Sequence, residues 1–454
     1  MRILFLTVAD KSHLHIAAPL AWALQTAGHE VCMVSQSGLA DVITPTGLTG
    51  VELGEPEEIR LTSRMNEREP EKDPERDPGR EPDVRAADGE APKQPTGDAP
   101  EHRHRHNPRQ SDYARDDPGA EFESLVTNLF PVMCPDPLFD DLVDFARAWE
   151  PDLVIWDMLT YAGPVVARAS GAAHARLLLA TDGVGQLWSA IPEKLRGSGG
   201  PLYNWLEPKL ERFGCDFGED MAVGQWTIDP MPWWTYHPAG IHYLPMRHLP
   251  FNGPAMAPRW LYDKPARRRV CITLGNSHRD AGRVEAPVGT LIEAVAGLDI
   301  EVIATFGAQQ VDPLPSLPDN VRTTSFIPLN VLLPSCSAII HHGGAGTFAG
   351  AVEHGVPQLI VPSTWWSEKW YGPVAMANGL QERGAGIYVC DSDRLTADRL
   401  RDDLVRVLEE PSFGENAARL GTEVRGMPTP NDIVPALERL TARHRGSRSR
   451  PGGL

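Results

Sequence analysis

The stretch SAIIHHGGAGTFAGAVEHGVPQLIVP, residues 337–362, decides the fold of this chain. An apolar run over 338–340 has the character of a buried strand, and a segment with helical spacing follows the glycines. The turn between them consists of His341, His342, Gly343, Gly344, Gly346 and Thr347. A strand, a glycine-rich turn and a helix start favour phosphate, because free backbone N–H groups and the positive helix end attract an anion. The turn therefore predicts an anion site.

The turn differs from the two best-known nucleotide loops. It lacks the G-K-[ST] ending of a Walker loop, and it is not G-x-G-x-x-G, a fingerprint that the first strand–helix unit also lacks. A nicotinamide enzyme is therefore disfavoured. We expect one histidine to donate to a phosphate and the other to face the core; a capped turn without a ligand is the alternative reading.

The rest of the chain has an α/β rhythm that starts twice. Residues 2–8 and 31–35 read as strands around a helix over 16–30, which Gly28 closes. After a Pro-rich polar stretch the rhythm restarts with a strand at 269–275. We expect two α/β halves with a ligand cleft between them, at the carboxyl ends of the strands.

Two long stretches depart from this rhythm. Residues 60–118 are nearly all charged, Pro, Gly and Ala, and cannot offset their ordering entropy by burial, so a disordered insertion is predicted. Its His102, His104 and His106 could bind a metal in principle, but an adventitious solvated tract is the favoured reading. Residues 185–240 are rich in Trp and read as irregular.

Composition excludes several classes of function. The formal net charge of −18 argues against a nucleic-acid partner, which requires clustered Lys and Arg. The 6 cysteines show no C-x-x-C spacing, so neither a zinc site nor a redox motif is indicated. No apolar run is long enough to span a bilayer. We predict a cytoplasmic protein with no membrane partner.

Several motifs together resemble one family. HHGGAGTFAGAVEHGVPQLIVP, KSHLHIAAPLAWALQTAGHEV, DLVIWDMLTYAGPVVARASGAAHARLL and GPVAMANGLQERGAGIYV look like nucleotide-sugar glycosyltransferases of the GT-B fold. The likeness is strongest to bacterial antibiotic glycosyltransferases that place TDP-deoxysugars on macrolides and aromatic polyketides. It covers nearly the whole chain except 60–118. It implies an α/β GT-B fold, with two facing Rossmann-like domains and an interdomain cleft.

The resemblance also implies a division of the chain. The acceptor-binding domain would span 1–240, a linker 241–262 and the nucleotide-sugar domain 263–430. Residues 431–454 would form a final helix, which packs back on the first domain in this fold, and a flexible tail.

Donor-binding residues are carried over from the same family. His342 would contact the donor diphosphate, and the loop after the 269–275 strand would face the same group. SFIPLN matches the segment that cradles the nucleobase. The diphosphate candidates are Gly275, Asn276, Ser277, His342, Gly343, Gly344 and Thr347, and the nucleobase candidates are Phe326 and Ile327.

Sugar transfer with inversion needs a base that deprotonates the acceptor hydroxyl. A histidine near neutral pKa suits this task, and a carboxylate can orient it. His13 and His15 read as residues of the loop after the first strand, and Asp157 ends the 153–157 strand. By resemblance the base is His13 and its partner is Asp157, with His15 as the runner-up.

One stretch departs from the family pattern. Where an Asp usually holds donor sugar hydroxyls, this chain has STWWSEKWYGP, with Trp366 at the expected Asp position and Ser367 next. Glu368 lies nearby and could substitute. The absence of this Asp fits a heavily deoxygenated sugar, because a buried carboxylate with no sugar hydroxyl to bind would be costly. The tryptophans could equally wall an aromatic acceptor pocket.

The expected activity is inverting transfer of a deoxysugar from a TDP-sugar to a polyketide-type aglycone, without a metal. The alternatives are a nucleotide-sugar epimerase and a non-catalytic sugar-nucleotide binder. The resemblance also implies a possible cytochrome-like auxiliary activator protein. A homodimer is a further hypothesis.

Overall fold

The computed structural model describes residues 1–36, 39–53, 117–235, 237–275, 287–307, 310, 316–362 and 372–446. Most of the insertion expected at 60–118 therefore lies outside the described residues. Its end was predicted slightly too late, because helix α4 (Pro118–Ser124) begins at Pro118. The Asp117 side chain accepts hydrogen bonds from the backbone N–H groups of Gly119 and Ala120 and so caps this helix.

The first half of the chain is built on a parallel sheet. Among the described residues this sheet has seven strands in the order β3-β2-β1-β4-β5-β6-β7. The strands are β1 (Arg2–Thr7), β2 (Glu30–Gln36), β3 (Thr49–Leu53), β4 (Leu153–Asp157), β5 (Ala173–Leu177), β6 (Trp226–Asp229) and β7 (Tyr243–Pro245). The strands predicted at 2–8, 31–35 and 153–157 are confirmed. Strand β4 is buried along its whole length, as is usual for a parallel strand covered on both faces.

Helix α1 (Lys11–Thr26) begins earlier than the sequence suggested. The Asp10 side chain accepts a hydrogen bond from the N–H of Ser12, which caps the helix at its N-terminus. His13 and His15 therefore lie in the first turns of α1, and their assignment to a loop was wrong. Gly28 adopts a φ of +85° just past the helix end, as its expected role in closing the helix requires.

Helices accompany the strands of the first sheet. They are α2 (Ala40–Ile43), α5 (Phe130–Met133), α6 (Asp136–Trp149), α7 (Ala162–Ser170), α8 (Gly183–Ala190), α9 (Pro201–Arg212) and α10 (Asp220–Val223), and a π-helical turn (Leu125–Leu129) joins α4 to α5. The irregular reading of 185–240 was wrong, because α9, α10, β6 and most of α8 fall in that range. Two of the tryptophans there pack in the core: Trp188 and Trp226 are at most 4% exposed, whereas Trp233 is 58% exposed.

The second half repeats the architecture around another parallel sheet. Among the described residues its six strands run in the order β10-β9-β8-β11-β12-β13. They are β8 (Arg268–Thr273), β9 (Ile300–Thr305), β10 (Val321–Thr323), β11 (Cys336–His341), β12 (Gln358–Ile360) and β13 (Gly386–Tyr388). The accompanying helices are α12 (Val288–Val295), α14 (Leu329–Leu332), α15 (Ala345–Glu353), α17 (Pro373–Glu382), α18 (Ala397–Glu409) and α19 (Pro411–Arg425). Two Rossmann-like halves are thus confirmed.

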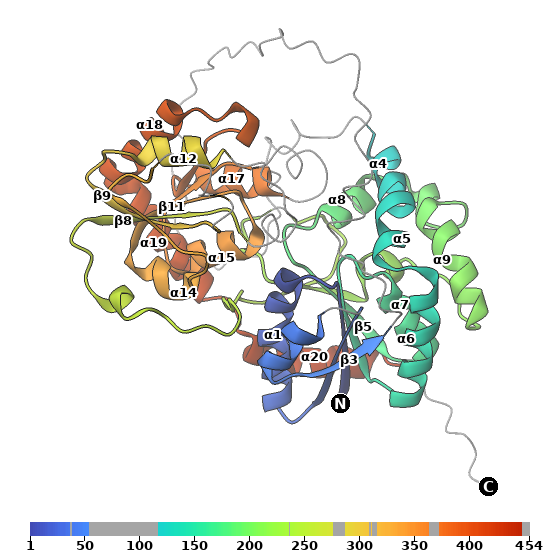
Figure 1. The fold of residues 1–454 in the computed structure, drawn as a ribbon. Coiled ribbons are helices and arrows are strands. Elements are labelled where there is room, and N and C mark those ends of the chain that lie inside the picture. Colours follow the sequence, from blue (N-terminus) through green and yellow to red (C-terminus); the bar gives the residue numbers. More distant parts are fainter. Residues whose placement is uncertain are drawn as a thin grey trace, which may run out of the picture.

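The last helix returns to the first half. Helix α20 (Pro430–His444) lies beside α1 in Figure 1, although the two stand at opposite ends of the sequence. Ile433, Val434 and Leu437 are buried in one apolar cluster with Leu14 and other residues of the first half. Burial of this apolar face stabilises the helix on the first sheet.

Strand β7 falls inside the range 241–262 that the sequence assigned to a linker. It pairs with β6, so the first half extends at least to Pro245.

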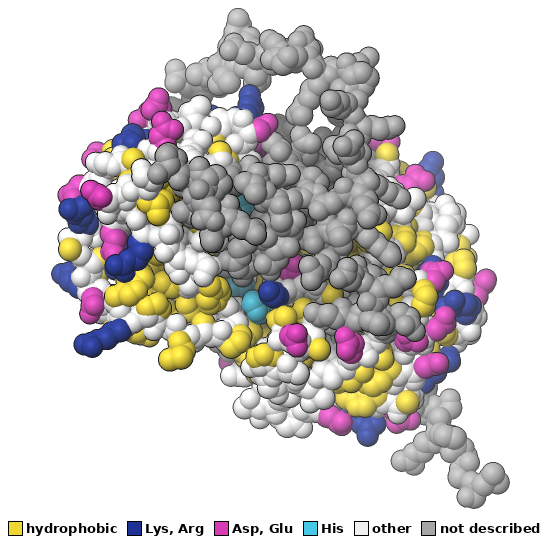
Figure 2. Space-filling view, in the orientation of Figure 1, with side chains coloured by type: hydrophobic (Ala, Val, Ile, Leu, Met, Phe, Trp, Pro, Cys, Tyr) yellow, Lys and Arg dark blue, Asp and Glu magenta, His cyan; other side chains and the backbone are white. Residues whose placement is uncertain are grey.

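No helix in the described ranges is long and apolar enough to cross a membrane. On the face drawn in Figure 2, acidic and basic side chains are interspersed over both halves.

Candidate active site

A His–Asp pair lies at the carboxyl edge of the first sheet. His13 comes from the first turn of α1 and Asp157 from the last position of β4, which is the strand next to β1. Nδ1 of His13 lies 2.6 Å from Oδ2 of Asp157, and the two side chains are 5% and 8% exposed. Oδ1 of Asp157 accepts a hydrogen bond from the N–H of Leu159 at 2.9 Å, which fixes the carboxylate.

The carboxylate changes the acidity of the imidazole. Burial by itself disfavours the charged form of His13, but the charge of Asp157 and its hydrogen bond outweigh this effect. The pKa of His13 is therefore raised above its ordinary value. An imidazole held in this way can take a proton at Nε2 while the carboxylate stabilises the resulting cation.

His15, the runner-up for the base, has different neighbours. Its ring lies edge-on to Phe251 at a centroid distance of 4.9 Å and within about 3.5 Å of the position that a Cβ on Gly253 would take. Burial lowers the pKa of His15, although the charge of Asp10 opposes the shift. The structure thus pairs His13 with Asp157 and places His15 against Phe251 and Gly253.

The two histidines of the opening motif have separate environments. His341 is 1% exposed, its Nε2 lies 2.8 Å from Oε1 of Gln358, and its Nδ1 accepts a hydrogen bond from the N–H of Gly343 at 3.1 Å. Burial lowers the pKa of His341 to about 4, so the ring is neutral at pH 7. His341 faces the core, as expected of one of the pair, and supports the turn. The sequence did not single out Gln358, since a glutamine in an apolar strand carries no signal of its own.

His342 lies over the end of the neighbouring strand. A Cβ on Gly275, which follows β8, would stand 2.5 Å from Cε1 of His342, and one on Gly344 would stand 3.0 Å from its Nε2. Strands β8 and β11 are paired, so their carboxyl ends meet at this point. The structure therefore brings together three of the residues that the sequence assigned to the diphosphate: Gly275, His342 and Gly344.

Space requires a glycine at position 343 of the turn. Gly343 has a φ of +90°, and a Cβ there would stand 2.7 Å from Cβ of Pro373. Gly344 caps helix α15 at its N-terminus, and Thr347 lies in the first turn of that helix. Backbone N–H groups at a helix N-terminus suit a phosphate oxygen.

The nucleobase candidates lie on opposite sides of their backbone. Phe326 is 39% exposed, whereas Ile327 is 3% exposed and packs among Leu332, Leu333 and Ile339. Phe326 can therefore offer its ring to a ligand, while Ile327 can offer only backbone groups.

Four predicted site residues lie outside the described residues: Asn276, Ser277, Trp366 and Ser367, together with the substitute candidate Glu368. The first described residue after that second stretch is Gly372. A Cβ on Gly372 would stand 2.1 Å from Oγ1 of Thr181, so the loop after β5 touches the second half there. Among the described residues, no group of three or more His, Cys, Asp or Glu could hold a metal ion.

Comparison with known proteins agrees with this arrangement. The N-terminal and C-terminal domain models of the erythromycin biosynthesis protein CIII-like family match residues 94–275 and 289–440. The chain is 46% identical over 462 residues to aclacinomycin-T 2-deoxy-L-fucose transferase of Streptomyces galilaeus, covering 100% of this chain and 99% of the relative. It is 40% identical over 454 residues to 10-deoxymethynolide desosaminyltransferase of Streptomyces venezuelae, covering 98% of each.

Solved structures show the same fold. The glycosyltransferase VinC in complex with dTDP superposes with a TM-score of 0.78 at 36% identity, covering 98% of this chain and 100% of VinC. Spinosyn forosaminyltransferase SpnP superposes with a TM-score of 0.74 at 37% identity, covering 97% and 99%. These relatives transfer sugars, and nothing among them supports the epimerase alternative. The chain therefore belongs to the erythromycin biosynthesis protein CIII-like family and is a glycosyltransferase of the GT-B fold.

Proposed function

We propose that this glycosyltransferase moves a deoxysugar, with inversion, from a TDP-sugar to a polyketide-type aglycone in antibiotic biosynthesis. The buried pair of His13 and Asp157, with 2.6 Å between Nδ1 and Oδ2, carries the proposal. The relatives that transfer 2-deoxy-L-fucose and desosamine, and the dTDP complex of VinC, support the substrate classes.

His13 is the base in this proposal. Its Nδ1–H donates to Asp157, which leaves Nε2 free to accept the proton of the acceptor hydroxyl. The acceptor oxygen then forms a bond to the anomeric carbon, while the bond from that carbon to the diphosphate oxygen breaks and its electron pair leaves with TDP. Asp157 stabilises the imidazolium that forms.

The second half holds the donor. His342, the backbone of Gly343 and Gly344, and Thr347 bind the diphosphate, with Gly275, Asn276 and Ser277 on the other side of it. Backbone N–H groups and the N-terminus of α15 stabilise the charge that develops on the leaving diphosphate, so the proposal needs no metal. Phe326 stacks on the nucleobase, next to the backbone of Ile327.

Trp366 and Ser367 read the sugar in this proposal. Trp366 replaces a carboxylate that would need a hydroxyl partner, which favours a donor with few hydroxyl groups. A matched pair of donors tests this assignment: TDP-glucose should be a poor donor and TDP-2-deoxy-L-fucose a good one. Equal use of both would remove the assignment.

The assembly of the protein completes the proposal. In this proposal the enzyme acts in the cytoplasm, is activated by a cytochrome-like auxiliary protein, and forms a homodimer. Pull-down of the activator and rescue of activity by it would support its role; full activity of the purified enzyme alone would contradict it. Light scattering on the purified protein separates a dimer from a monomer.

Two variants of helix α1 test the base. His13→Ala should lower kcat by about 10²-fold or more while TDP binding, measured by calorimetry, stays within about twofold, since His13 lies in the other half. His15→Ala, two positions along the same helix, is the matched comparison and should lose far less. Unchanged turnover of His13→Ala would remove His13 from the role, and a large loss in His15→Ala alone would transfer the role to His15.

A further inference from the structure

A loop of the first half reaches into the core of the second. It follows β6 and carries Met231 and Trp234. Met231 is 1% exposed and lies in an apolar cluster whose other members, such as Phe348, Met376 and Leu380, belong to the second half. Trp234 packs against the same cluster. The halves are therefore joined here by the buried Met231 and the partly buried Trp234.

Trp234 contacts two helices of the second half at once. Its ring lies 5.8 Å from that of Phe348 on α15, in an edge-on arrangement. A Cβ on Gly379 of α17 would stand only 3.0 Å from Cζ3 of Trp234, so the indole lies directly on this glycine. The guanidinium of Arg383, just after α17, lies 4.8 Å from the indole centroid. The indole is thus enclosed by α15 and α17.

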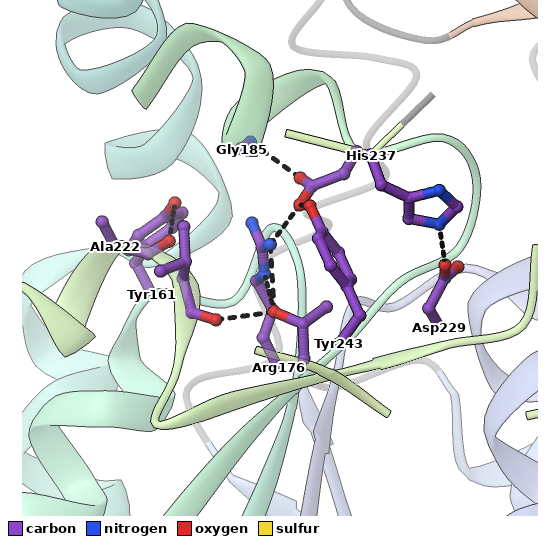
Figure 3. A network of polar contacts seen from close by, with 10 residues as sticks. Tyr161, Arg176, Gly185, Ala222, Asp229, His237 and Tyr243 are labelled. Carbon is purple, nitrogen blue, oxygen red and sulfur yellow. Dashed lines mark hydrogen bonds and ion pairs between the residues drawn. The ribbon is translucent and has the colours of Figure 1, made fainter. Parts of the chain in front are cut away.

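The base of the loop is rigidly attached to the first sheet. Oδ1 of Asp229 accepts a hydrogen bond from the N–H of Met231 at 2.9 Å, and Oδ2 contacts Nε2 of His237 (Figure 3). The His237 ring lies edge-on to Tyr243 on β7 at 4.9 Å, and the Tyr243 hydroxyl donates to Asp182 at 2.7 Å.

Asp182 extends this attachment into the sheet. It contacts the buried Arg176 of β5 and accepts a hydrogen bond from the N–H of Gly185 in α8 at 2.7 Å (Figure 3). Since both charges of the pair are fully buried and hydrogen-bonded, they hold this edge of the sheet in one arrangement.

We propose that Met231 and Trp234 form a fixed joint between the halves, and that Trp234 is a positioning residue for sugar transfer. This inference rests on the proposed function, because it assumes that the second half holds the donor. The two helices at the joint are those next to the donor: α15 starts at the turn proposed to hold the diphosphate, and α17 follows the stretch proposed to read the sugar. The joint therefore sets the position of the anomeric carbon relative to His13.

Such a residue should affect turnover more than donor binding. The turn keeps its own support within the second half, from the contact of His341 with Gln358 and from the packing of α15 on α19. An error of about 1 Å in the position of reacting groups can cost about 10²-fold in rate. Loss of the joint should therefore lower kcat while the affinity for TDP is retained.

Variants at adjacent tryptophans test the proposal in the full-length enzyme. Trp234→Ala should lower kcat at least about tenfold and leave the Kd for TDP within about threefold. Trp234→Phe keeps an aromatic ring on Gly379 and should restore kcat to within about threefold. Trp233→Ala is the matched control, since Trp233 is 58% exposed and should leave both quantities unchanged.

A substitution from the other side of the joint covers the case in which Trp234→Ala does not fold. Gly379→Ala suits a helix, but its methyl group should displace the indole and lower kcat severalfold. In a Trp234→Ala background that folds, the same change should have no effect, because no ring remains to be displaced.

Four results would overturn the proposal. The first is an unchanged kcat in Gly379→Ala or in Trp234→Ala, and the second is a TDP affinity that falls in parallel with kcat. The third is a failure of Trp234→Phe to restore kcat, and the fourth is independent effects of Trp234→Ala and Gly379→Ala in the double variant. If the wild-type enzyme neither binds TDP nor transfers sugar, the proposed function fails instead.

Discussion

Nδ1 of His13 lies 2.6 Å from Oδ2 of Asp157, although 144 positions separate the two residues in the sequence. The contact exists because β1 and β4 are adjacent in the sheet and α1 starts directly above their carboxyl ends. The proposed chemistry depends on this contact.

The first prediction concerns the pH dependence of transfer. A neutral His13 is the active base, so kcat/KM falls as pH drops through its pKa. Because the wild-type pKa is raised above 6.5, the acid limb should lie above pH 6.5. In Asp157→Asn the carboxylate is lost and burial is opposed only by the charge of Asp10, so the limb should move to lower pH and the plateau should fall about 10²-fold or more.

The control for this variant lies at the other end of the same strand. Asp152 precedes β4 and accepts a hydrogen bond from the N–H of Arg2 at 2.8 Å, far from the carboxyl edge. Asp152→Asn should keep the wild-type profile. An acid limb that stays in place in Asp157→Asn would show that another group titrates.

The second prediction concerns the grip on the diphosphate. Gly275→Ala places a methyl group 2.5 Å from Cε1 of His342 and should displace that ring, weakening TDP binding by about tenfold in calorimetry. Gly297→Ala is matched in backbone strain, since the φ angles are +73° and +74°, but a Cβ on Gly297 meets nothing within 4 Å. Equal TDP affinity of the two variants would separate His342 from the donor.

Much of the fold follows from local pattern. Strand β11 before the HHGGAGT turn was predictable because parallel strands read as short apolar runs, and the end of α1 was predictable because Gly28 marks a helix end. The start of α1 was missed, although Asp10 before Ser12 is the kind of capping residue that begins a helix. Reading this cap would have placed His13 on the helix from sequence alone.

The loop after β6 could not be predicted. Region 185–240 combines many aromatic residues with prolines, and Pro201 and Pro208 both lie in α9, one at its start and one inside. Local pattern therefore suggested irregular structure. The packing of Met231 and Trp234 against the other half depends on how the halves meet, which no local periodicity encodes.

The third prediction concerns the buried ion pair of the first half. The side chains of Arg176 and Asp182 are both 0% exposed, so Arg176→Ala leaves a buried carboxylate without its cation. The free energy of unfolding should fall by about 3–5 kcal/mol in urea denaturation. Arg406→Ala breaks an exposed pair with Glu410 and should cost less than about 1 kcal/mol. Similar losses in both variants would contradict this account.

The fourth prediction concerns the attachment of α20. Leu437 is 0% exposed against the first half, and Leu437→Ala should lower the free energy of unfolding by about 2–5 kcal/mol. Leu440, one turn later, is only partly buried, and Leu440→Ala should cost clearly less in the same denaturation experiment. If the order of the two costs is reversed, the helix is held in another way.

Analysis of the reaction products tests the central claim most directly. The purified enzyme, with and without a cytochrome-like activator, is incubated with a panel of TDP-deoxysugars, including TDP-2-deoxy-L-fucose, and polyketide aglycones, and is read by mass spectrometry and NMR. We predict an aglycone that gains one deoxysugar, release of one TDP per product, and inverted anomeric configuration. Retained configuration, or conversion of the TDP-sugar without transfer to any acceptor, would contradict the account.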